Sequence, residues 1–368
     1  MSPRWSPAVL ALALALPCRA EEALESGFAS LSGDVKTEGA ALAERLGEPK
    51  TRRQVVRIIS WNLQAFGANI TPEREAAYKD IMGHMLSETR SARILSFQEI
   101  ANGTGAAKIS GMLPGGDGDR WRGSFTNTDG AMDNGFFAEK SVGMDCERPL
   151  FAKQDETGRW RRDREQMMHT PRASHMRVGG FDFTLVTVHL TFGGANRAGT
   201  AKELGTLLDW LHQYLAKPGA DPDVIITGDF NLPTRRGRTD ERGPSIEDVM
   251  GAHPLGRTPA GTPLPPWGLV TLVDAPTSRN DTGTAHNYDH VIMTGDAYNE
   301  EYAAGSAGVI PPQYINSVEA KHGVRVSDHY PISAGFFTEG AGNDGRPIGP
   351  DGDSACQALM AMAPLSFQ

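Results

Sequence analysis

The sequence feature that most constrains the fold is a series of short runs rich in β-branched and aromatic residues. Such runs predict strands that are buried in a sheet. They lie at residues 54–62, 92–100, 134–142, 181–190, 223–231, 287–295 and 329–337. Apolar residues at helical spacing follow the first run, at 71–88, and precede the fifth, at 197–215. The alternation predicts one α/β domain with a strand-rich core.

Polar residues stand at the ends of these predicted strands. In α/β proteins, strand ends and the loops beyond them are where ligands bind. The residues are Asn62, Glu99, His189, Asp229, Asn231, Asp289, Asp328 and His329. Capping and turn chemistry would explain any one of them alone. Their recurrence over the whole chain favours a shared site instead.

The carboxylates and amides of this group are the ligands that hard divalent cations prefer. The sequence has no Cys/His cluster with zinc spacing, so oxygen ligands indicate Mg²⁺, Mn²⁺ or Ca²⁺. Asp229 and Asn231 are two residues apart in an extended segment, which places both side chains on one side. We expect Asp229 to orient a water nucleophile and Asn231 to donate a hydrogen bond to a phosphoryl oxygen.

Two histidines of the group, His189 and His329, are candidate acid–base residues, because imidazole changes its charge near neutral pH. Each needs a carboxylate that fixes its tautomer and stabilises its charge. Asp289 is the candidate for one of them.

Six short motifs, "SWNLQAFG", "FQEI", "TVHLTFGG", "TGDFNLP", "YDHVIM" and "SDHYPI", occur in this order between residues 54 and 337. Together they resemble the endonuclease/exonuclease/phosphatase superfamily, and its deoxyribonuclease-I-like branch in particular. The resemblance implies a four-layer α/β sandwich, with two packed mixed β-sheets flanked by helices. It also implies metal-dependent hydrolysis of a phosphate ester.

The resemblance assigns roles to individual residues. Asn62 and Glu99 are expected at a metal ion with Asp328 nearby. His329, paired with Asp289, is expected to act on the phosphate and the water nucleophile, which Asp229 and Asn231 orient. His189 is expected to assist the leaving oxygen. A divalent ion and fixed donors stabilise the charge that develops on the phosphoryl oxygens.

Two further positions follow from the same resemblance. Asp133, just before a middle strand, matches the carboxylate that supports the histidine at His189, with Glu139 as an alternative. The family often has an arginine that grips a phosphate two residues before a proline. Here His169 occupies that place and Arg172 follows the proline, so either residue is a candidate for the phosphate contact.

Two arginine clusters, at residues 159–164 and 234–242, contain interleaved acidic residues. Such clusters are typical of solvated loops. The second begins just after Asn231, however, and its Arg235 and Arg236 are candidates for contacts with neighbouring phosphates of a polyanion. In the first cluster Trp160 is a candidate for base stacking or for packing.

The first 20 residues have the pattern of a secretory signal peptide: Arg4, a short apolar run and small Ala20 before an acidic pair. A buried N-terminal helix and a lipoprotein signal at Cys18 are the alternatives. Cleavage near Ala20 predicts a secreted or periplasmic protein. It removes Arg4 and Arg19 and no acidic residue, which changes the formal net charge from −9 to −11. An anionic substrate must then be held by local cations.

Two cysteines remain after cleavage, Cys146 and Cys356. In an oxidising compartment a pair of this kind indicates one disulfide, with two buried free thiols as the alternative. We expect four regions: the signal peptide at 1–20, an N-terminal extension at 21–53, the catalytic domain at 54–337 and a weakly structured tail at 338–368. The proline- and glycine-rich stretch at 232–267 is expected to be mostly loop.

The sequence thus predicts a secreted metal-dependent phosphodiesterase, and an endonuclease acting on DNA or RNA before other substrates. A phosphatase or a sphingomyelinase-like enzyme acting on phospholipid headgroups is the first alternative, and a non-catalytic binding module on the same fold is the second. No segment after the signal peptide is apolar and long enough to span a bilayer, so no stable membrane insertion is expected. The protein is expected to be a monomer.

Overall fold

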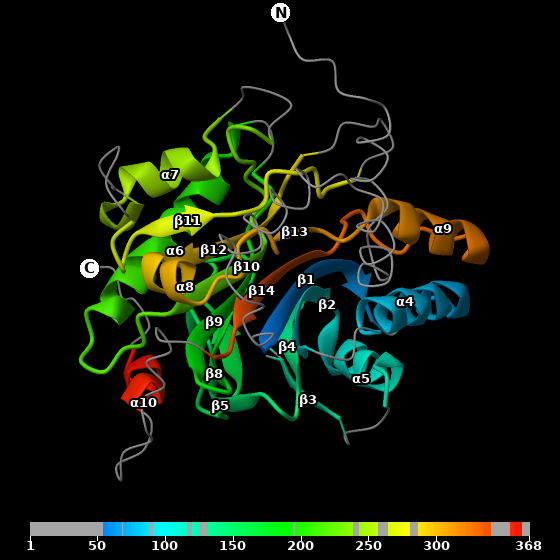
Figure 1. Ribbon diagram of the computed structural model, residues 1–368, viewed down its shortest axis with the longest axis horizontal. Helices are drawn as coiled ribbons and strands as arrows, with labels where there is room; N and C mark the ends of the chain where they lie inside the picture. The colour runs from blue at the N-terminus through cyan, green and yellow to red at the C-terminus, as the bar shows by residue number, and fades with distance from the viewer. Residues whose placement is uncertain are drawn as a thin grey trace, which may run out of the picture. The chain divides into compact units, whose positions relative to one another are not determined.

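The structure is a computed structural model of the chain (Figure 1). It describes residues 54–67, 69–87, 91–115, 120–125, 128, 132–193, 196–237, 243–256, 264–279, 286–339 and 354–362. The chain divides into two units, Met1–Arg52 and Arg53–Gln368, and every described residue belongs to the second. The predicted signal peptide and N-terminal extension lie outside the described residues.

The strands of the described residues form two six-stranded mixed sheets and one hairpin. The first sheet has the order β13 (Gly308–Val309), β14 (Ile332–Phe337), β1 (Val55–Phe66), β2 (Ala92–Ile100), β4 (Asp133–Glu139) and β3 (Trp121–Phe125). The second has the order β11 (Leu269–Thr271), β12 (Asp289–Thr294), β10 (Val224–Asp229), β9 (Phe181–His189), β8 (Arg172–Val178) and β5 (Gly143–Pro149). The hairpin consists of β6 (Ala152–Gln154) and β7 (Trp160–Arg162).

Helices cover the outer face of each sheet, so the expected four-layer α/β sandwich is confirmed (Figure 1). The first sheet packs against α4 (Pro72–Met85), α5 (Asn102–Met112) and α9 (Pro312–His322). The second packs against α6 (Ala198–Leu215), α7 (Ile246–Ala252), the 3-10 helix η2 (Pro254–Gly256) and α10 (Ser354–Met360). A short helix, α8 (Gly295–Glu300), follows β12. None of the helices in the described ranges combines the length and the apolar character needed to cross a membrane.

The buried strands divide their side chains between two layers of core. In β1, Ile58 belongs to the apolar cluster between the sheets, and Ile59 to the cluster beneath the helices. In β10, Ile225 and Ile226 divide in the same way. Successive residues of a strand face opposite sides. Because both sides are covered here, these strands read as continuous apolar runs in the sequence.

Two segments that were expected to be mostly irregular contain helices. Within 232–267, α7 begins at a capping box in which the hydroxyl of Ser245 accepts a hydrogen bond from the Asp248 backbone N–H and the Asp248 carboxylate accepts one from the Ser245 N–H. Within the C-terminal tail, α10 buries Ala358 and Leu359 in the same apolar cluster as α6. The sequence did not predict these helices, because helices this short owe their stability to caps and tertiary packing, which periodicity does not report.

A disulfide between Cys146 of β5 and Cys356 of α10 attaches the tail to the second sheet, across 210 residues of sequence. The pairing expected from the cysteine count is therefore present. Arg148 of β5 supports the same contact, because its guanidinium donates hydrogen bonds to the backbone carbonyls of Leu359, Met360 and Met362.

We expect Cys356→Ser to lower the free energy of unfolding by about 2–4 kcal/mol, because the disulfide closes a long loop of the unfolded chain. The measurement is denaturant unfolding of the wild type and the variant, with and without reductant. Reductant should destabilise the wild type to the level of the variant and leave the variant unchanged. Equal stability of the oxidised wild type and the variant would contradict the prediction.

Candidate active site

The polar residues of the predicted strand ends converge at one end of the sandwich. In the first sheet β1 and β2 are parallel and β14 is antiparallel to β1, so β14 begins where β1 and β2 end. In the second sheet β9 and β10 are parallel and β12 is antiparallel to β10, so β12 begins where they end. Six of the eight residues line one pocket of about 430 Å³: Glu99, His189, Asp229, Asn231, Asp328 and His329.

The backbone around this pocket adopts conformations that side chains usually avoid. Glu99 has φ 58° and Asn231 has φ 50°, both in the left-handed region. Such residues cost roughly 1–3 kcal/mol each and cluster at functional sites. Gly228 has φ 144°, and a Cβ there would lie 2.0 Å from the carbonyl oxygen of Val188. This close approach of β10 to β9 positions Asp229 beside His189.

His329 forms a buried ion pair with Asp289, as the sequence suggested for one of the two histidines. Nδ1 of His329 lies 2.7 Å from Oδ2 of Asp289. The backbone N–H of Asp289 donates to the Thr277 hydroxyl at 3.0 Å, which helps to position the strand. Burial disfavours the imidazolium, but the charges of Asp289 and Asp229 outweigh it and raise the pKa of His329 to about 10. His329 therefore carries a positive charge at neutral pH.

Asp229 is the centre of the arrangement. Its Oδ2 atom lies 3.5 Å from Nε2 of His329 and 3.6 Å from Nε2 of His189. Oδ2 accepts a hydrogen bond from the Asn62 amide at 3.0 Å, and Oδ1 accepts one from the backbone N–H of Asn231 at 3.0 Å. Burial raises the pKa of Asp229, while the charge of His329 opposes the shift. The carboxylate is thus held rigidly between two imidazoles.

Glu99 and Asp328 offer oxygen atoms that suit a divalent cation. Asp328 Oδ1 is buried and accepts no hydrogen bond from the described residues. The Glu99 carboxylate is held by the backbone N–H of Ala65 at 2.8 Å and by the Asn62 amide at 3.0 Å. Hard oxygen ligands of this kind fit Mg²⁺, Mn²⁺ or Ca²⁺.

Asn62 links Glu99, beside which it was expected to bind a metal ion, to Asp229. Its amide nitrogen, and not its carbonyl oxygen, faces Glu99 and Asp229, while the carbonyl accepts from the Gln64 backbone N–H at 2.9 Å. In this arrangement Asn62 holds the carboxylates in position. Its role as a metal ligand stays a prediction.

Asn231 also contacts the protein rather than the pocket centre. Its side-chain amide nitrogen donates to the backbone carbonyl of Leu190 at 2.9 Å. This bond ties the loop after β10 to the end of β9, next to His189. The side-chain amide of Asn231 has two hydrogens, and one of them is used in the bond to Leu190. The expected bond to a phosphoryl oxygen therefore requires the second hydrogen.

Asp133 was expected to support His189, and the described structure shows no bond between them. Instead, the Asp133 carboxylate accepts hydrogen bonds from the hydroxyl and the backbone N–H of Thr128, at 2.8 and 3.3 Å. Burial raises the pKa of Asp133 to about 6, with the Thr128 bonds opposing the shift. The alternative, Glu139, is also wrong for this role, because it forms salt bridges with Arg93 and Arg120 at 2.9 and 2.8 Å.

His169 lies against His189 instead of presenting a positive charge. The two rings stack with centroids 4.2 Å apart and planes 11° apart. Burial, with the charge of His189, lowers the pKa of His169 to about 3, so the imidazole is neutral at pH 7. A neutral ring lacks the positive charge with which the family's arginine grips a phosphate, and a phosphate contact of His169 stays a prediction. It fixes the orientation of His189.

Arg172 is equally unsuited to the phosphate role. Its guanidinium is buried and donates to Ser124 and to Glu147, the latter at 2.7 Å. The residue therefore joins β8 to β3 and β5 and does not line the pocket. Its place after the proline directs the side chain into the body of the protein, which the motif alone does not reveal.

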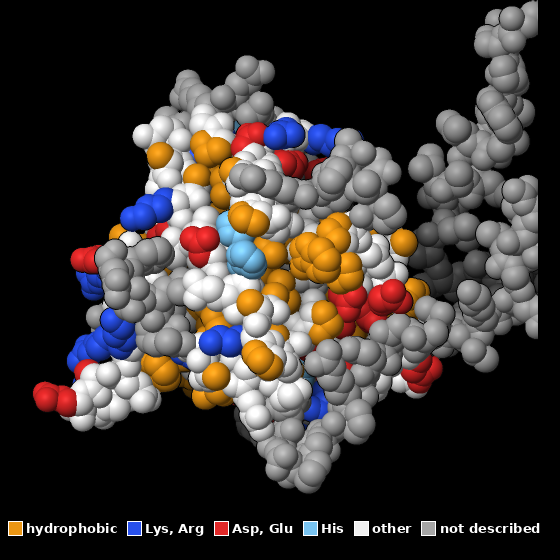
Figure 2. Space-filling view, turned by 90° about the vertical axis from the view of Figure 1, so that its left-hand side faces the viewer, with side chains coloured by type: hydrophobic (Ala, Val, Ile, Leu, Met, Phe, Trp, Pro, Cys, Tyr) orange, Lys and Arg blue, Asp and Glu red, His pale blue; other side chains and the backbone are white. Residues whose placement is uncertain are grey.

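The arginines after Asn231 do not line the pocket either. Arg235 donates to the Asp248 carboxylate at 2.6 and 3.1 Å, so its charge is neutralised at the start of α7. Arg236 is exposed and lies 3.7 Å from an oxygen of Asp274. The contact of Arg235 and Arg236 with neighbouring phosphates of a substrate stays a prediction. On the face in Figure 2, Lys and Arg side chains form separate small groups among acidic and apolar ones.

Aromatic residues at the pocket were missed by the sequence analysis. Phe192 is 67% exposed and lies edge-on to Tyr288, with centroids 6.3 Å apart. Tyr288 in turn stacks on His286 at 5.0 Å. All three line the pocket, with Ser278 and Arg279. Their positions were a usable signal, since Phe192 is three residues after His189 and Tyr288 directly precedes Asp289.

The fold is that of the endonuclease/exonuclease/phosphatase proteins, as the resemblance predicted. One similar solved structure is an endonuclease/exonuclease/phosphatase family protein from Bacteroides thetaiotaomicron, with 15% identity and a TM-score of 0.50, covering 78% of this chain and 99% of that one. Another is D. rerio TDP2 complexed with single strand DNA product, with 14% identity and a TM-score of 0.50, covering 77% and 98%. No family model and no curated protein matches the chain.

Proposed function

We propose that the protein is a divalent-metal-dependent phosphodiesterase, and an endonuclease acting on DNA, or on RNA, in particular. The observation that carries the proposal is the convergence of two imidazoles on one buried carboxylate. His189, His329 and Asp229 come from both sheets, and each Nε2 atom lies 3.5–3.6 Å from the same Asp229 oxygen. Beside them, Glu99 and Asp328 offer cation ligands in one pocket.

Each of these groups has a separate role in ester hydrolysis. His329, held as an imidazolium by Asp289, donates a hydrogen bond to a non-bridging phosphoryl oxygen and stabilises its developing charge. Asp229 orients the attacking water and accepts its proton, as its central position allows. His189, oriented by the stacked ring of His169, donates a proton to the leaving oxygen. The water forms the new P–O bond as the ester bond breaks.

A divalent ion fits the oxygen atoms of Glu99 and Asp328, with Asn62 holding the Glu99 carboxylate in position. When bound, such an ion supplies Lewis-acid stabilisation of negative charge on the phosphoryl group. Mg²⁺ or Mn²⁺ suits these ligands best, and Ca²⁺ is the third candidate.

The aromatic rim of the pocket favours a nucleic acid over other phosphodiesters. Phe192, Tyr288 and His286 present planar rings beside the catalytic residues. Bases stack on such rings with little sequence preference. The solved D. rerio TDP2 structure is a complex with single strand DNA product, which supports the same substrate class. A site built within one chain is consistent with a monomer.

We expect Phe192→Ala to raise KM for single-stranded DNA by roughly 5- to 150-fold, since each stacked base contributes about 1–3 kcal/mol. The value of kcat should change little, because Phe192 lies outside the reacting group. Initial rates over a range of oligonucleotide concentrations measure both constants. The matched control is Trp267→Ala, which removes another exposed aromatic residue that does not line the pocket. Equal KM values for wild type and Phe192→Ala would rule out stacking at this position.

We also propose that the protein is secreted or periplasmic after cleavage near Ala20. Two observations support this location: the signal-peptide pattern of the first 20 residues and the disulfide between Cys146 and Cys356. Disulfides persist in oxidising compartments. Sequencing the N-terminus of the protein recovered from the periplasm or medium tests the cleavage site.

The experiment that tests the proposed function uses the chain from Glu21 onward and supercoiled plasmid. Nicking should require Mg²⁺ or Mn²⁺ and should stop when a chelator is added. Release of phosphate or headgroup from small esters or phospholipids, without nicking, would keep the catalytic residues and replace the substrate class. No hydrolysis of any of these substrates would favour the non-catalytic binding module.

A further inference from the structure

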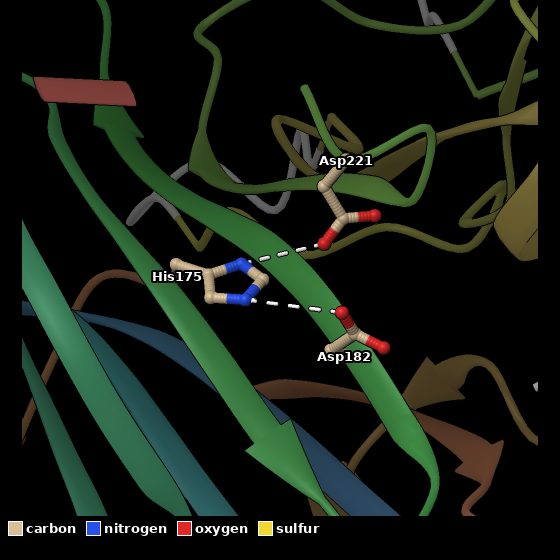
Figure 3. A group of neighbouring side chains, drawn as sticks. All are labelled: His175, Asp182 and Asp221. Carbon is tan, nitrogen blue, oxygen red and sulfur yellow. Dashed lines mark ion pairs between the residues drawn. The ribbon is translucent and has the colours of Figure 1, made fainter. Parts of the chain in front are cut away.

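A second cluster of potential metal ligands lies at the opposite end of the second sheet. It consists of His175 of β8, Asp182 of β9 and Asp221, which precedes β10 (Figure 3). Asp182 and His189 are seven residues apart on β9, which corresponds to about 23 Å of extended strand. The proposed reaction uses none of these three residues.

All three side chains are buried. His175 is fully buried, Asp221 is 3% exposed and Asp182 is 7% exposed. Burying carboxylates is costly unless a positive charge or strong hydrogen bonds compensate. Oδ1 of Asp221 accepts the backbone N–H of Asp223 at 2.8 Å, but Oδ2 accepts no hydrogen bond from the described residues. This oxygen points at the imidazole of His175 (Figure 3).

The ion pairs within the cluster are longer than charge-assisted hydrogen bonds. Nδ1 of His175 lies 3.3 Å from Oδ2 of Asp221, and Nε2 lies 3.9 Å from Oδ2 of Asp182. Charge-assisted N–H···O bonds are about 2.7–2.9 Å long, as in the 2.7 Å contact between His329 and Asp289. Ligand atoms bound at about 2.1 Å to one metal ion lie about 3–4.2 Å apart.

One ligand atom from each of the three residues comes close to this spacing, so a small shift of the side chains would bring all three to one ion. These atoms all lie within 4.8 Å of one another.

We propose that His175, Asp182 and Asp221 form a structural site for a first-row divalent transition metal ion such as Zn²⁺. An imidazole nitrogen combined with two carboxylates suits Zn²⁺ better than Mg²⁺ or Ca²⁺, which prefer oxygen ligands alone. The ion joins β8, β9 and the entry to β10, so it stabilises the second sheet from the end opposite to the active site. Because its ligands are buried, the ion binds as the chain folds and exchanges slowly.

The test is metal analysis of the chain from Glu21 onward, refolded with ZnCl₂ and then dialysed against EDTA in the native state. We expect about one zinc per chain to remain, because the chelator reaches an open pocket and not a buried site. Unfolding in the presence of EDTA should release the ion. In Asp328→Asn, which removes a ligand of the active-site pocket, about one zinc should still remain.

Asp221→Asn, which keeps the side-chain shape, should retain no zinc after the same treatment. We expect its Tm after refolding with ZnCl₂ to be lower than that of the wild type by roughly 5 °C or more, and to be equally low with or without zinc. Asp155→Asn, an aspartate in the loop between β6 and β7, is the matched control. If Asp221→Asn fails to fold, the comparison of wild type refolded with and without ZnCl₂ still decides. If the wild type retains no zinc and its Tm does not respond to zinc, the proposal is overturned and the cluster is an ion-paired group without a metal.

Discussion

His329→Ala is expected to reduce kcat for plasmid or oligonucleotide hydrolysis by about 10³-fold or more. The variant loses an imidazolium that donates to the phosphoryl group, and such preorganised donors contribute about 10²–10³-fold each. It also leaves Asp289 buried without its positive partner at 2.7 Å, which adds to the loss by distorting the pocket. Single-turnover rates at saturating metal measure the effect.

The matched control is His212→Ala. His212 is an exposed histidine in the last turn of α6 and does not line the pocket, so its removal should change the rate less than about twofold. Circular dichroism of both variants checks that they are folded. Hydrolysis by a folded His329→Ala protein at the wild-type rate would refute the assignment of this pocket as the catalytic site.

Asp289→Asn is expected to have the second largest effect, and its signature is a changed pH profile. Without the Asp289 carboxylate, burial still disfavours the imidazolium of His329. The remaining charges of Asp229 and Asp328 stabilise the imidazolium less than all three carboxylates do. The pKa of His329 should therefore fall from about 10. The active protonated form is then lost at lower pH, and kcat/KM of the variant should decline over a range in which the wild type still holds its proton.

The same pair affects stability in a defined pH window. A histidine whose pKa is raised on folding contributes stability that is fully present below its unfolded pKa, about 6.5, and is lost as pH rises toward the folded value. We expect the wild type to lose this contribution between about pH 6.5 and 10, and Asp289→Asn to lack most of it throughout. The measurements are kcat/KM and denaturant unfolding from pH 5 to 10.

Asp274→Asn provides the control for this prediction. Asp274 is an exposed acid outside the pocket, 3.7 Å from Arg236. Its variant should have the wild-type pH profile. An Asp289→Asn protein with reduced activity but an unshifted profile would show that Asp289 acts by packing and not through the charge of His329.

Local sequence patterns were sufficient to predict the sandwich and most of its strands. Ile58 and Ile59 lie in continuous apolar runs because both faces of β1 are covered, and that pattern is visible without a structure. The helix of residues 197–215 was predicted almost to its boundaries, because its long apolar face repeats at helical spacing. Short α7 and α10 were missed because a capping box and a disulfide, not periodicity, hold them in place.

The strand ends also predicted which polar residues meet. Parallel strands end on the same side of a sheet, and motif order identified Glu99, His189, Asp229 and His329 as one group. The pairing of His329 with Asp289 followed from the need of an imidazole for a carboxylate, and the structure shows it at 2.7 Å. The spacing of residues along the chain did not predict the distances between residues on different sheets.

The tertiary structure alone decided the partners of the remaining charged residues. Arg172 and Arg235 adjoin active-site motifs and were candidates for phosphate contacts. In the structure they form salt bridges with Glu147 and Asp248, 25 and 13 residues away along the chain. His169 stands where an arginine was expected, and only packing against His189 shows it to be neutral. The sequence by itself determined the strands, the sandwich and the set of polar strand ends, since these depend on local periodicity and chain order. Charge state, side-chain direction and the buried cluster at His175 depend on contacts between distant segments, and those exist only once the chain has folded.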